Sequence, residues 1–398
     1  MASRLTGAVL LLCFLFAGWF SVRAAQADLE YRENTLASLE KATALAPDNA
    51  VFRALLGENM ESAGRDPKPE LAETTRLSPL DSQNWIRLAF QEEVEGDYAA
   101  AEAHLRRAAE VDHKAPPRWA LMNFYFRRNR DPEFWFWVTK ALEMSQGDAT
   151  AIFRLAWDRS ESEREILSRI PKRKDLLTQY LHFLGASDRL DAAHDVAIQV
   201  AQTAFAPELP TLMSYCNHYA AVDSARAVAV WNILCQRKLI GYSPLHPEAG
   251  SILTNADFTI EPAQLGFDWR LKAVEDASVS QSENGAGIRV ELGGNQPENC
   301  ILMEQTIPLI SGKTYVISWE SGASGTDAVS GLVWDLSQGP SEPSSGAISG
   351  EPGSNSGLLA FRASAVSAQL RLRYRRPLGL VRARGAVTLR SLRAVRQP

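Results

Sequence analysis

Cysteine and histidine are scarce in this chain of 398 residues, which contains four cysteines and six histidines. Beyond the N-terminal segment, the remaining cysteines are too few and too far apart for a disulfide framework or a zinc site. They are Cys216, Cys235 and Cys300. The histidines are scattered, and no H-E-x-x-H motif is present. We therefore expect no cofactor, and an odd number of thiols in this part of the chain leaves at least one cysteine free.

Recognisable catalytic motifs are also missing. Gly312-Lys313-Thr314 matches the last three residues of a phosphate-binding loop, but Ile307 occupies the position where that motif requires glycine. This failure predicts a protein that is not an enzyme. A glycan-active hydrolase remains the alternative, because its paired carboxylates need not be neighbours in the sequence.

The chain as a whole has no basic excess, since its formal net charge at pH 7 is −5. Nucleic-acid-binding proteins usually carry such an excess, so no nucleic acid partner is expected. The average hides a local exception: the segment from Arg362 to Arg396 contains ten arginines and no Asp, Glu or Lys.

The N-terminal segment, residues 1–27, predicts export from the cytoplasm. Arg4 precedes Leu5–Val22, a run of eighteen uncharged residues that is long enough to cross most of a bilayer as a helix. The positive-inside rule then places the rest of the chain outside the cytoplasm. Ala25-Gln26-Ala27 also offers a signal-peptidase site. The segment is therefore either an inner-membrane anchor, with the rest of the chain in the periplasm, or a signal peptide whose cleavage gives a secreted protein.

Residues 28–240 show a helical repeat. Large and small apolar residues recur in the stretch after Ser82, at Trp85, Leu88, Ala89, Ala101, Leu105 and Ala108. Candidate repeat ends follow one another at intervals of 32, 34 and 34 residues, at Pro47, Pro79, His113 and Gly147. This pattern resembles the tetratricopeptide repeat, whose period is about 34 residues. The resemblance implies stacked helical hairpins, packed through the six residues above, that bind a protein partner.

Within this region the run Phe134-Trp135-Phe136-Trp137 has two interpretations. It serves either inter-repeat packing, which large apolar side chains favour, or ligand stacking.

A Pro- and Gly-rich linker is predicted at residues 241–250, and an all-β domain at 251–398. Residues alternate between apolar and polar in Ile288–Leu292, Thr314–Trp319 and Leu370–Arg375. Short alternating strands separated by turn residues predict an antiparallel β-sandwich of the jelly-roll type. Ser337–Gly357, rich in Ser, Gly and Pro, is expected to form a long mobile loop.

The order of motifs in this domain resembles the galactose-binding-like jelly rolls, which include carbohydrate-binding modules. The motifs are Asn255-Ala256-Asp257-Phe258, Gly266–Arg270, Gln305–Leu309 and Gly312–Tyr315. The resemblance implies a fold whose members often bind glycans. Trp269, with Asp268 and Arg270 beside it, is the candidate ligand-binding cluster. The resemblance also leaves two alternatives open at Asn255 and Asp257: these residues either help to bind a structural calcium ion or bind no metal.

The C-terminal arginines suggest a second candidate site. Arg371, Arg373 and Arg375 share one face of a predicted strand. If the strands on either side of Pro377–Gly379 pair as a hairpin, more arginines join that face. It is then either a solvated surface neutralised by acids such as Glu304, or a site for an anionic glycan or membrane surface, because guanidinium binds carboxylate and phosphate in two places.

Together these features predict a multidomain protein, a helical array followed by a β-sandwich. The preferred interpretation is a non-catalytic envelope scaffold that assists extracellular polysaccharide assembly or export. The alternative is a pure protein-interaction scaffold, in secretion or pilus assembly, with a structural sandwich.

Overall fold

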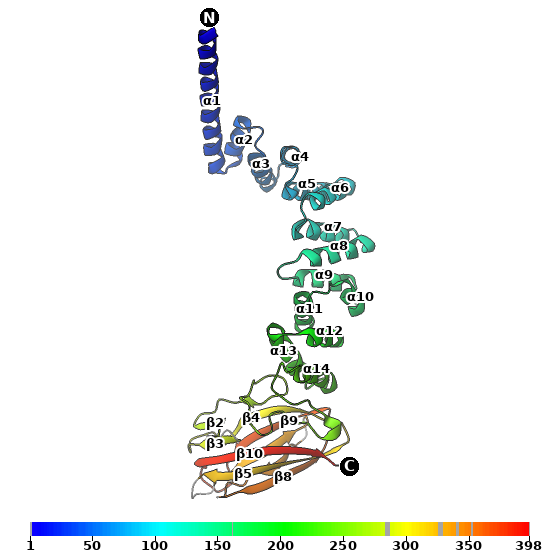
Figure 1. Ribbon diagram of the computed structural model, residues 1–398, viewed down its shortest axis with the longest axis vertical. Helices are drawn as coiled ribbons and strands as arrows, with labels where there is room; N and C mark the ends of the chain where they lie inside the picture. The colour runs from blue at the N-terminus through cyan, green and yellow to red at the C-terminus, as the bar shows by residue number, and fades with distance from the viewer. Residues whose placement is uncertain are drawn as a thin grey trace. The chain divides into compact units, whose positions relative to one another are not determined.

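The computed structural model describes residues 2–160, 162–282, 287–324, 329–339, 342–351 and 353–397. The chain divides into two compact units, Met1–Pro171 and Lys172–Pro398. The first unit is helical, and the second joins further helices to a β-sandwich (Figure 1). The predicted fold class, a helical repeat array followed by an antiparallel sandwich, is confirmed.

The first unit is a series of helices connected by short turns. They are α1 (Ala2–Glu33), α2 (Leu36–Leu45), α3 (Ala50–Ser62), α4 (Lys68–Leu77), α5 (Ser82–Glu95), α6 (Tyr98–Val111), α7 (Ala115–Arg127), α8 (Asp131–Met144), α9 (Thr150–Arg159) and α10 (Glu163–Arg169). Side chains cap several of the helices. The Asp81 carboxylate accepts from the Gln83 N–H at the start of α5, and Asp97 accepts from the Ala100 N–H at the start of α6. Such caps satisfy backbone donors that a helix cannot satisfy internally, and so fix where each hairpin turns.

The repeat positions identified in α5 and α6 are packing positions. Leu88 is 3% exposed, and Ala89, Ala101, Leu105 and Ala108 are 0% exposed. Trp85 is half-buried, and its indole N–H donates to the Pro79 carbonyl oxygen over 2.9 Å. The alanines allow the two helices to approach closely, while the leucines fill the space between neighbours.

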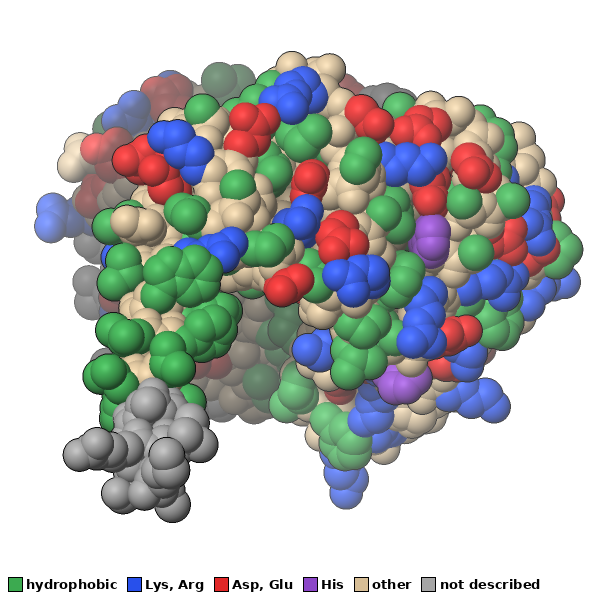
Figure 2. All heavy atoms as spheres, turned by 90° about the horizontal axis from the view of Figure 1, so that it is seen from above, with side chains coloured by type: hydrophobic (Ala, Val, Ile, Leu, Met, Phe, Trp, Pro, Cys, Tyr) green, Lys and Arg blue, Asp and Glu red, His purple; other side chains and the backbone are tan. Residues whose placement is uncertain are grey.

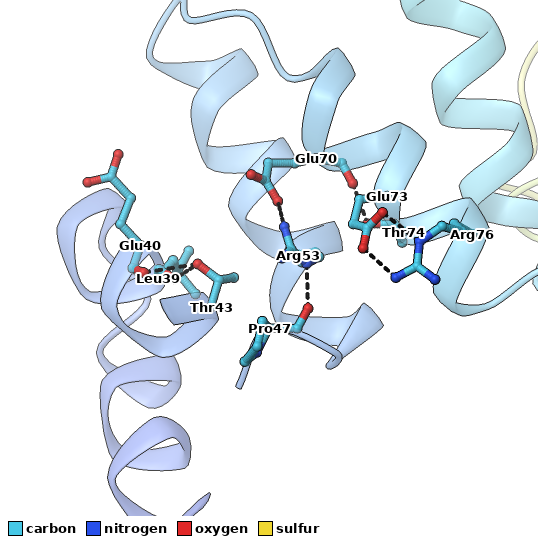
Figure 3. Close-up of polar contacts among 9 residues, drawn as sticks. All are labelled: Leu39, Glu40, Thr43, Pro47, Arg53, Glu70, Glu73, Thr74 and Arg76. Atoms are coloured by element: carbon cyan, nitrogen blue, oxygen red, sulfur yellow. Dashed lines mark hydrogen bonds and ion pairs between the residues drawn. The ribbon is translucent and has the colours of Figure 1, made fainter. Parts of the chain in front are cut away.

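Polar contacts hold α3 against the turn before it and against α4. The Arg53 guanidinium donates to the Pro47 carbonyl oxygen over 2.7 Å and pairs with Glu70 over 2.6 Å (Figure 3). Arg53 on α3 therefore links the preceding turn to α4. Its side chain is only 18% exposed, so this ion pair is more sheltered from solvent than the exposed pair of Arg76 and Glu73 on α4.

Helix α1 has two differently placed halves. Its first half exposes Leu10 to Val22, and hydrophobic side chains gather along it (Figure 2). Leu10–Glu33 is long and apolar enough to cross a membrane, a property that a signal sequence shares. The second half packs on α2 and α3: Ala27 is 0% exposed, and the Tyr31 ring stacks on Phe52 with 4.7 Å between centroids.

The second unit begins with α11 (Lys174–Ala186), α12 (Leu190–Thr203), α13 (Leu209–Tyr219) and α14 (Ser224–Gln236). Its strands are β1 (Arg270–Leu271), β2 (Ala277–Gln281), β3 (Ile288–Leu292), β4 (Asn299–Pro308), β5 (Thr314–Ser324), β6 (Leu332–Ser337), β7 (Ser344–Ala347), β8 (Asn355–Arg362), β9 (Ser367–Arg375) and β10 (Gly385–Arg396). They form two antiparallel sheets, ordered β1-β4-β9-β6-β7 and β2-β3-β10-β5-β8.

Two local expectations about this sandwich are wrong. The strands on either side of Pro377–Gly379, β9 and β10, do not form a hairpin, because they lie in different sheets. The stretch Ser337–Gly357 is not one long loop either. It contains β7, which pairs with β6, and the start of β8, which pairs with β5. Small residues there supply strands as well as turns.

The predicted linker, residues 241–250, packs against α14. The Asn232 side chain on α14 donates to the Leu245 carbonyl oxygen and accepts from the Leu245 N–H, both over 2.8 Å. The Tyr242 ring stacks on Trp231, with 5.5 Å between centroids. Prolines and glycines give this segment its turns, but its apolar side chains bind it to α14. Helices α11–α14 therefore belong to the same compact unit as the sandwich.

Candidate functional site

The predicted arginine face lies on the outer side of the sheet that contains β9, and most of it is neutralised. Arg371 pairs with Glu304 on β4 over 3.4 Å, and Arg373 pairs with the buried Asp335 on β6 over 2.9 Å. Lys272 also pairs with Glu304, over 2.6 Å. Burial raises and the two cations lower the pKa of Glu304, which ends below its usual value. These two arginines are therefore engaged within the sheet.

Arg375, at the end of β9, differs from the other two. Its side chain is exposed, and no ion pair to it forms within the part of the chain that the structure describes. The arginine face thus offers one guanidinium to a ligand rather than three.

The predicted cluster around Trp269 is part of the core. Trp269 is 0% exposed, lies 5.8 Å from Trp334 between ring centroids, and donates its indole N–H to the Asn255 carbonyl oxygen over 3.2 Å. A ring without an exposed face cannot stack on a sugar, so Trp269 is wrongly assigned as a ligand contact. Its sequence neighbourhood suggested a strand end but could not reveal that the ring points inward.

Asp268 and Arg270 have structural partners as well. The Asp268 carboxylate accepts from the Tyr242 hydroxyl over 2.6 Å and from the Ala263 N–H over 2.5 Å. Burial raises its pKa above the usual value. Arg270 donates to the Asn217 side chain on α13 and to the Gly266 carbonyl oxygen. Arg270 thus joins the sandwich to α13, and Asp268 joins it to the segment 241–250, which explains their position beside Trp269 without a ligand.

The polar atoms of Asn255 and Asp257 serve local turns. The Asn255 amide exchanges two hydrogen bonds with the Ile260 backbone, and Asp257 accepts from the Thr259 N–H and hydroxyl. Among the described residues, no group of three or more His, Cys, Asp or Glu side chains is placed to hold a metal ion.

A polar hollow opens where β2, β3 and β10 meet the loop after β3. It is shallow and broadly open to solvent, with a volume of about 580 Å³. Asp276, Ser278, Arg289, Glu291 and Arg384 supply its polar side chains. We call this feature the polar hollow.

The walls of the polar hollow are held by short-range contacts. The Asp276 carboxylate accepts from the Asn295 N–H over 2.6 Å, and the Asp276 carbonyl oxygen accepts from the Gly293 N–H over 2.9 Å. A Cβ atom at Gly293 would lie 2.1 Å from the Asp276 carboxylate, so a larger residue there would displace the Asp276 side chain. Arg289 and Glu291 are paired over 2.7 Å. Arg384 is exposed and forms no ion pair among the described residues.

Chemically, the polar hollow presents carboxylate, hydroxyl and guanidinium groups but no aromatic ring. Such groups exchange hydrogen bonds with the hydroxyls or carboxylate of a sugar. No sequence pattern indicates this hollow, although Glu291 lies in a predicted strand and Arg384 in the basic C-terminal segment. The missing signal is non-local, because Asp276 and Arg384 are more than a hundred residues apart.

The helical array exposes a second candidate surface. Phe90 is 43% and Val94 82% exposed on α5, and their spacing of four residues places them on one side of the helix. Beside them, Arg127 on α7 binds both oxygens of Glu93. In the aromatic run on α8, Phe134 and Trp135 are buried, whereas Phe136 is 52% exposed. The run therefore serves mainly packing.

No family model matches this chain, and no curated protein matches it. Solved structures with partial likeness include one titled "CBM4 structure and function", at 16% identity and TM-score 0.28, covering 36% of this chain and 99% of that one. Another is TmCBM61 in complex with beta-1,4-galactotriose, at 13% identity and TM-score 0.27, covering 37% and 98%. The helices are similar to Pseudomonas aeruginosa PilF, at 13% identity and TM-score 0.30, covering 46% and 92%. At such identities and scores the matches support no functional conclusion.

Proposed function

We propose that this chain is a non-catalytic scaffold of the cell envelope that is held in a membrane by α1 and assists the assembly or export of an extracellular polysaccharide. The observation that carries the proposal is that α1 combines an exposed apolar half with a half that packs on the protein. Within α1, the segment Leu10–Glu33 is long and apolar enough to cross a membrane, its first half is exposed, and its second half packs on α2 and α3. This arrangement supports a scaffold that is fixed to a bilayer by its N-terminal helix.

Membrane attachment is tested by location and extraction. A reporter enzyme fused after Pro398 should be active only in the exported compartment, since the positive-inside rule places that end outside the cytoplasm. The chain should also stay with membranes after washing at alkaline pH. Reporter activity in the cytoplasm would exclude an envelope role, and release by the wash would exclude the anchor.

The polar hollow is the proposed glycan contact. We expect the full chain in detergent to bind acidic or neutral polysaccharide fragments on a glycan array, with Arg384→Ala and Asp276→Ala each abolishing the signal. Arg393→Ala is the matched control, because Arg393 is exposed on β10, the strand that begins directly after Arg384, but does not line the hollow. Equal binding by all three variants would rule out the hollow.

The protein partner is proposed to bind the array at Phe90 and Val94. A photo-crosslinking residue in place of Val94 should attach one defined envelope protein, whereas the same residue in place of the exposed Ala99 on α6 should not. A glycosyltransferase or polymerase component as that partner supports the polysaccharide role. A secretion or pilus component, together with no glycan binding, favours the pure protein-interaction scaffold.

A further inference from the structure

The loop between β9 and β10 exposes three aliphatic side chains. Leu378 is 98%, Leu380 50% and Val381 86% exposed. We call these three residues the apolar tip. Single exposed aliphatic residues are common on protein surfaces, but three within four positions form a patch that requires an explanation.

The backbone of the loop is ordered by its own hydrogen bonds. The Leu380 N–H donates to the Pro377 carbonyl oxygen over 3.2 Å, and Gly379 between them has φ 79°, as the third residue of a type II turn requires. The Arg376 guanidinium donates to the Leu380 carbonyl oxygen over 2.9 Å. Polar backbone groups satisfied in this way can enter an apolar medium at low cost.

The base of the loop is equally fixed. Ala383 donates its N–H to the Tyr374 hydroxyl over 2.9 Å and accepts from the Gln296 side chain over 2.8 Å, and all three residues are buried. The apolar tip therefore projects from a rigid foundation at one end of the sandwich.

Arginines flank the apolar tip in the sequence. Arg375 and Arg376 precede it, and Arg382 and Arg384 follow it. Glu298 is the acidic partner here, 3.1 Å from Arg376 and 3.7 Å from Arg382. Within the described part of the chain, Arg375 and Arg384 have no ion-pair partner. These four arginines, here called the arginine collar, leave a positive excess around an apolar centre.

We propose that the apolar tip and the arginine collar form a docking site for a bilayer that contains anionic phospholipid. The three aliphatic side chains enter the boundary between head groups and acyl chains, and the guanidinium groups bind lipid phosphates. The tip has no aromatic ring or hydrogen-bonding side chain with which to recognise a glycan. Protein interfaces are usually enriched in aromatic residues, which it also lacks.

The proposal rests on the proposed function in one respect: α1 keeps a membrane within reach of the chain. It goes beyond that function by giving the sandwich its own lipid contact. Two attachments on one chain reinforce each other, because the second binding event becomes intramolecular.

The test uses the full chain with Leu378→Cys labelled by a polarity-sensitive fluorophore and reconstituted into vesicles. The labelled parent chain supplies the background from the native thiols. In vesicles of phosphatidylcholine with phosphatidylglycerol, we expect a blue shift and protection from an aqueous quencher. In phosphatidylcholine alone, both effects should be smaller. Leu358→Cys is the matched control, since Leu358 is an exposed aliphatic residue on β8, outside this loop, and its label should stay in water in both.

Further variants separate the contributions of lipid, phosphate and charge. Arg375→Gln combined with Arg382→Gln, or high salt, should reverse most of the shift at position 378. Inorganic phosphate should compete only weakly if lipid is the ligand, and full reversal by phosphate would overturn lipid docking in favour of a free-anion site. A label that stays in water on anionic vesicles would also overturn it, as would an equal shift on both lipids. A chain that resists the alkaline wash while its label stays in water would refute the tip and leave the α1 anchor intact.

Discussion

Among single residues, Asp268 shows how a charged side chain can belong to the interior. It receives hydrogen bonds from Tyr242 and Ala263, yet burial still raises its pKa. A carboxyl group whose pKa is higher in the folded than in the unfolded chain favours folding at low pH, and this contribution is lost as pH rises through the folded-state pKa. Asp268 therefore contributes less stability at neutral pH than in acid.

This reasoning predicts the effect of Asp268→Asn. The difference in melting temperature between the variant and the wild type should shift in favour of the variant as pH rises from about 4, near the unfolded-state pKa of Asp. Thermal unfolding at a series of pH values measures it. Glu304→Gln is an informative comparison, because the pKa of Glu304 is lowered and its removal should cost more stability near neutral pH than in acid. A constant difference for Asp268→Asn would contradict the buried, raised-pKa carboxyl.

Ala101 provides a second test on one side chain. It is 0% exposed between α5 and α6, so Ala101→Trp should overpack the hairpin and cost roughly 1–3 kcal/mol or more of stability. Denaturant unfolding measures the loss. Ala99→Trp, on the exposed side of the same helix, should have little effect. Equal stability of both variants would mean that the repeat register is wrong.

Among the secondary-structure elements, α1 decides whether the N-terminal segment remains on the mature chain. The peptidase site after Ala27 lies within a helix whose Arg23 donates to the Leu45 and Ala44 carbonyl oxygens over 2.6 and 3.2 Å. Cleavage would remove Arg23 from the last carbonyls of α2, where a cation is favourable. We predict that the mature chain keeps residues 23–27. Intact-mass measurement of the membrane-bound protein tests this, and a mature chain that begins at Asp28 would contradict it.

Elements were easier to predict from the sequence than their pairing. Alternation in Ile288–Leu292 and Leu370–Arg375 correctly indicated strands, because burial of one face leaves a local period of two. The same local signal cannot assign β9 and β10 to different sheets, since that depends on contacts far apart in the sequence. For the same reason the polar hollow was missed, whereas the α5–α6 hairpin, whose contacts are local, was recognised.

At the scale of the whole molecule, the division after Pro171 predicts which fragments are stable. Residues 172–398 should unfold at a higher temperature than residues 251–398, which lack Trp231 and Tyr242. Loss of buried aromatic packing of this kind typically costs about 3–5 kcal/mol. Calorimetry of the two fragments measures the difference, and dye binding should report exposed apolar surface on the shorter one. Identical melting temperatures would show that the sandwich is independent of α14.

The docking of residues 241–250 onto α14 also bears on how such a gene can be rearranged. A recombination event that joins a new partner at residue 251 would transfer a sandwich whose Phe267 has lost the Trp231 ring against which it packs, 5.6 Å away. An exchange near residue 172 would instead carry the sandwich with the helices that cover it. Recombination that transfers this β-domain between genes should therefore favour the larger segment, which includes helices α11–α14 as well as the strands.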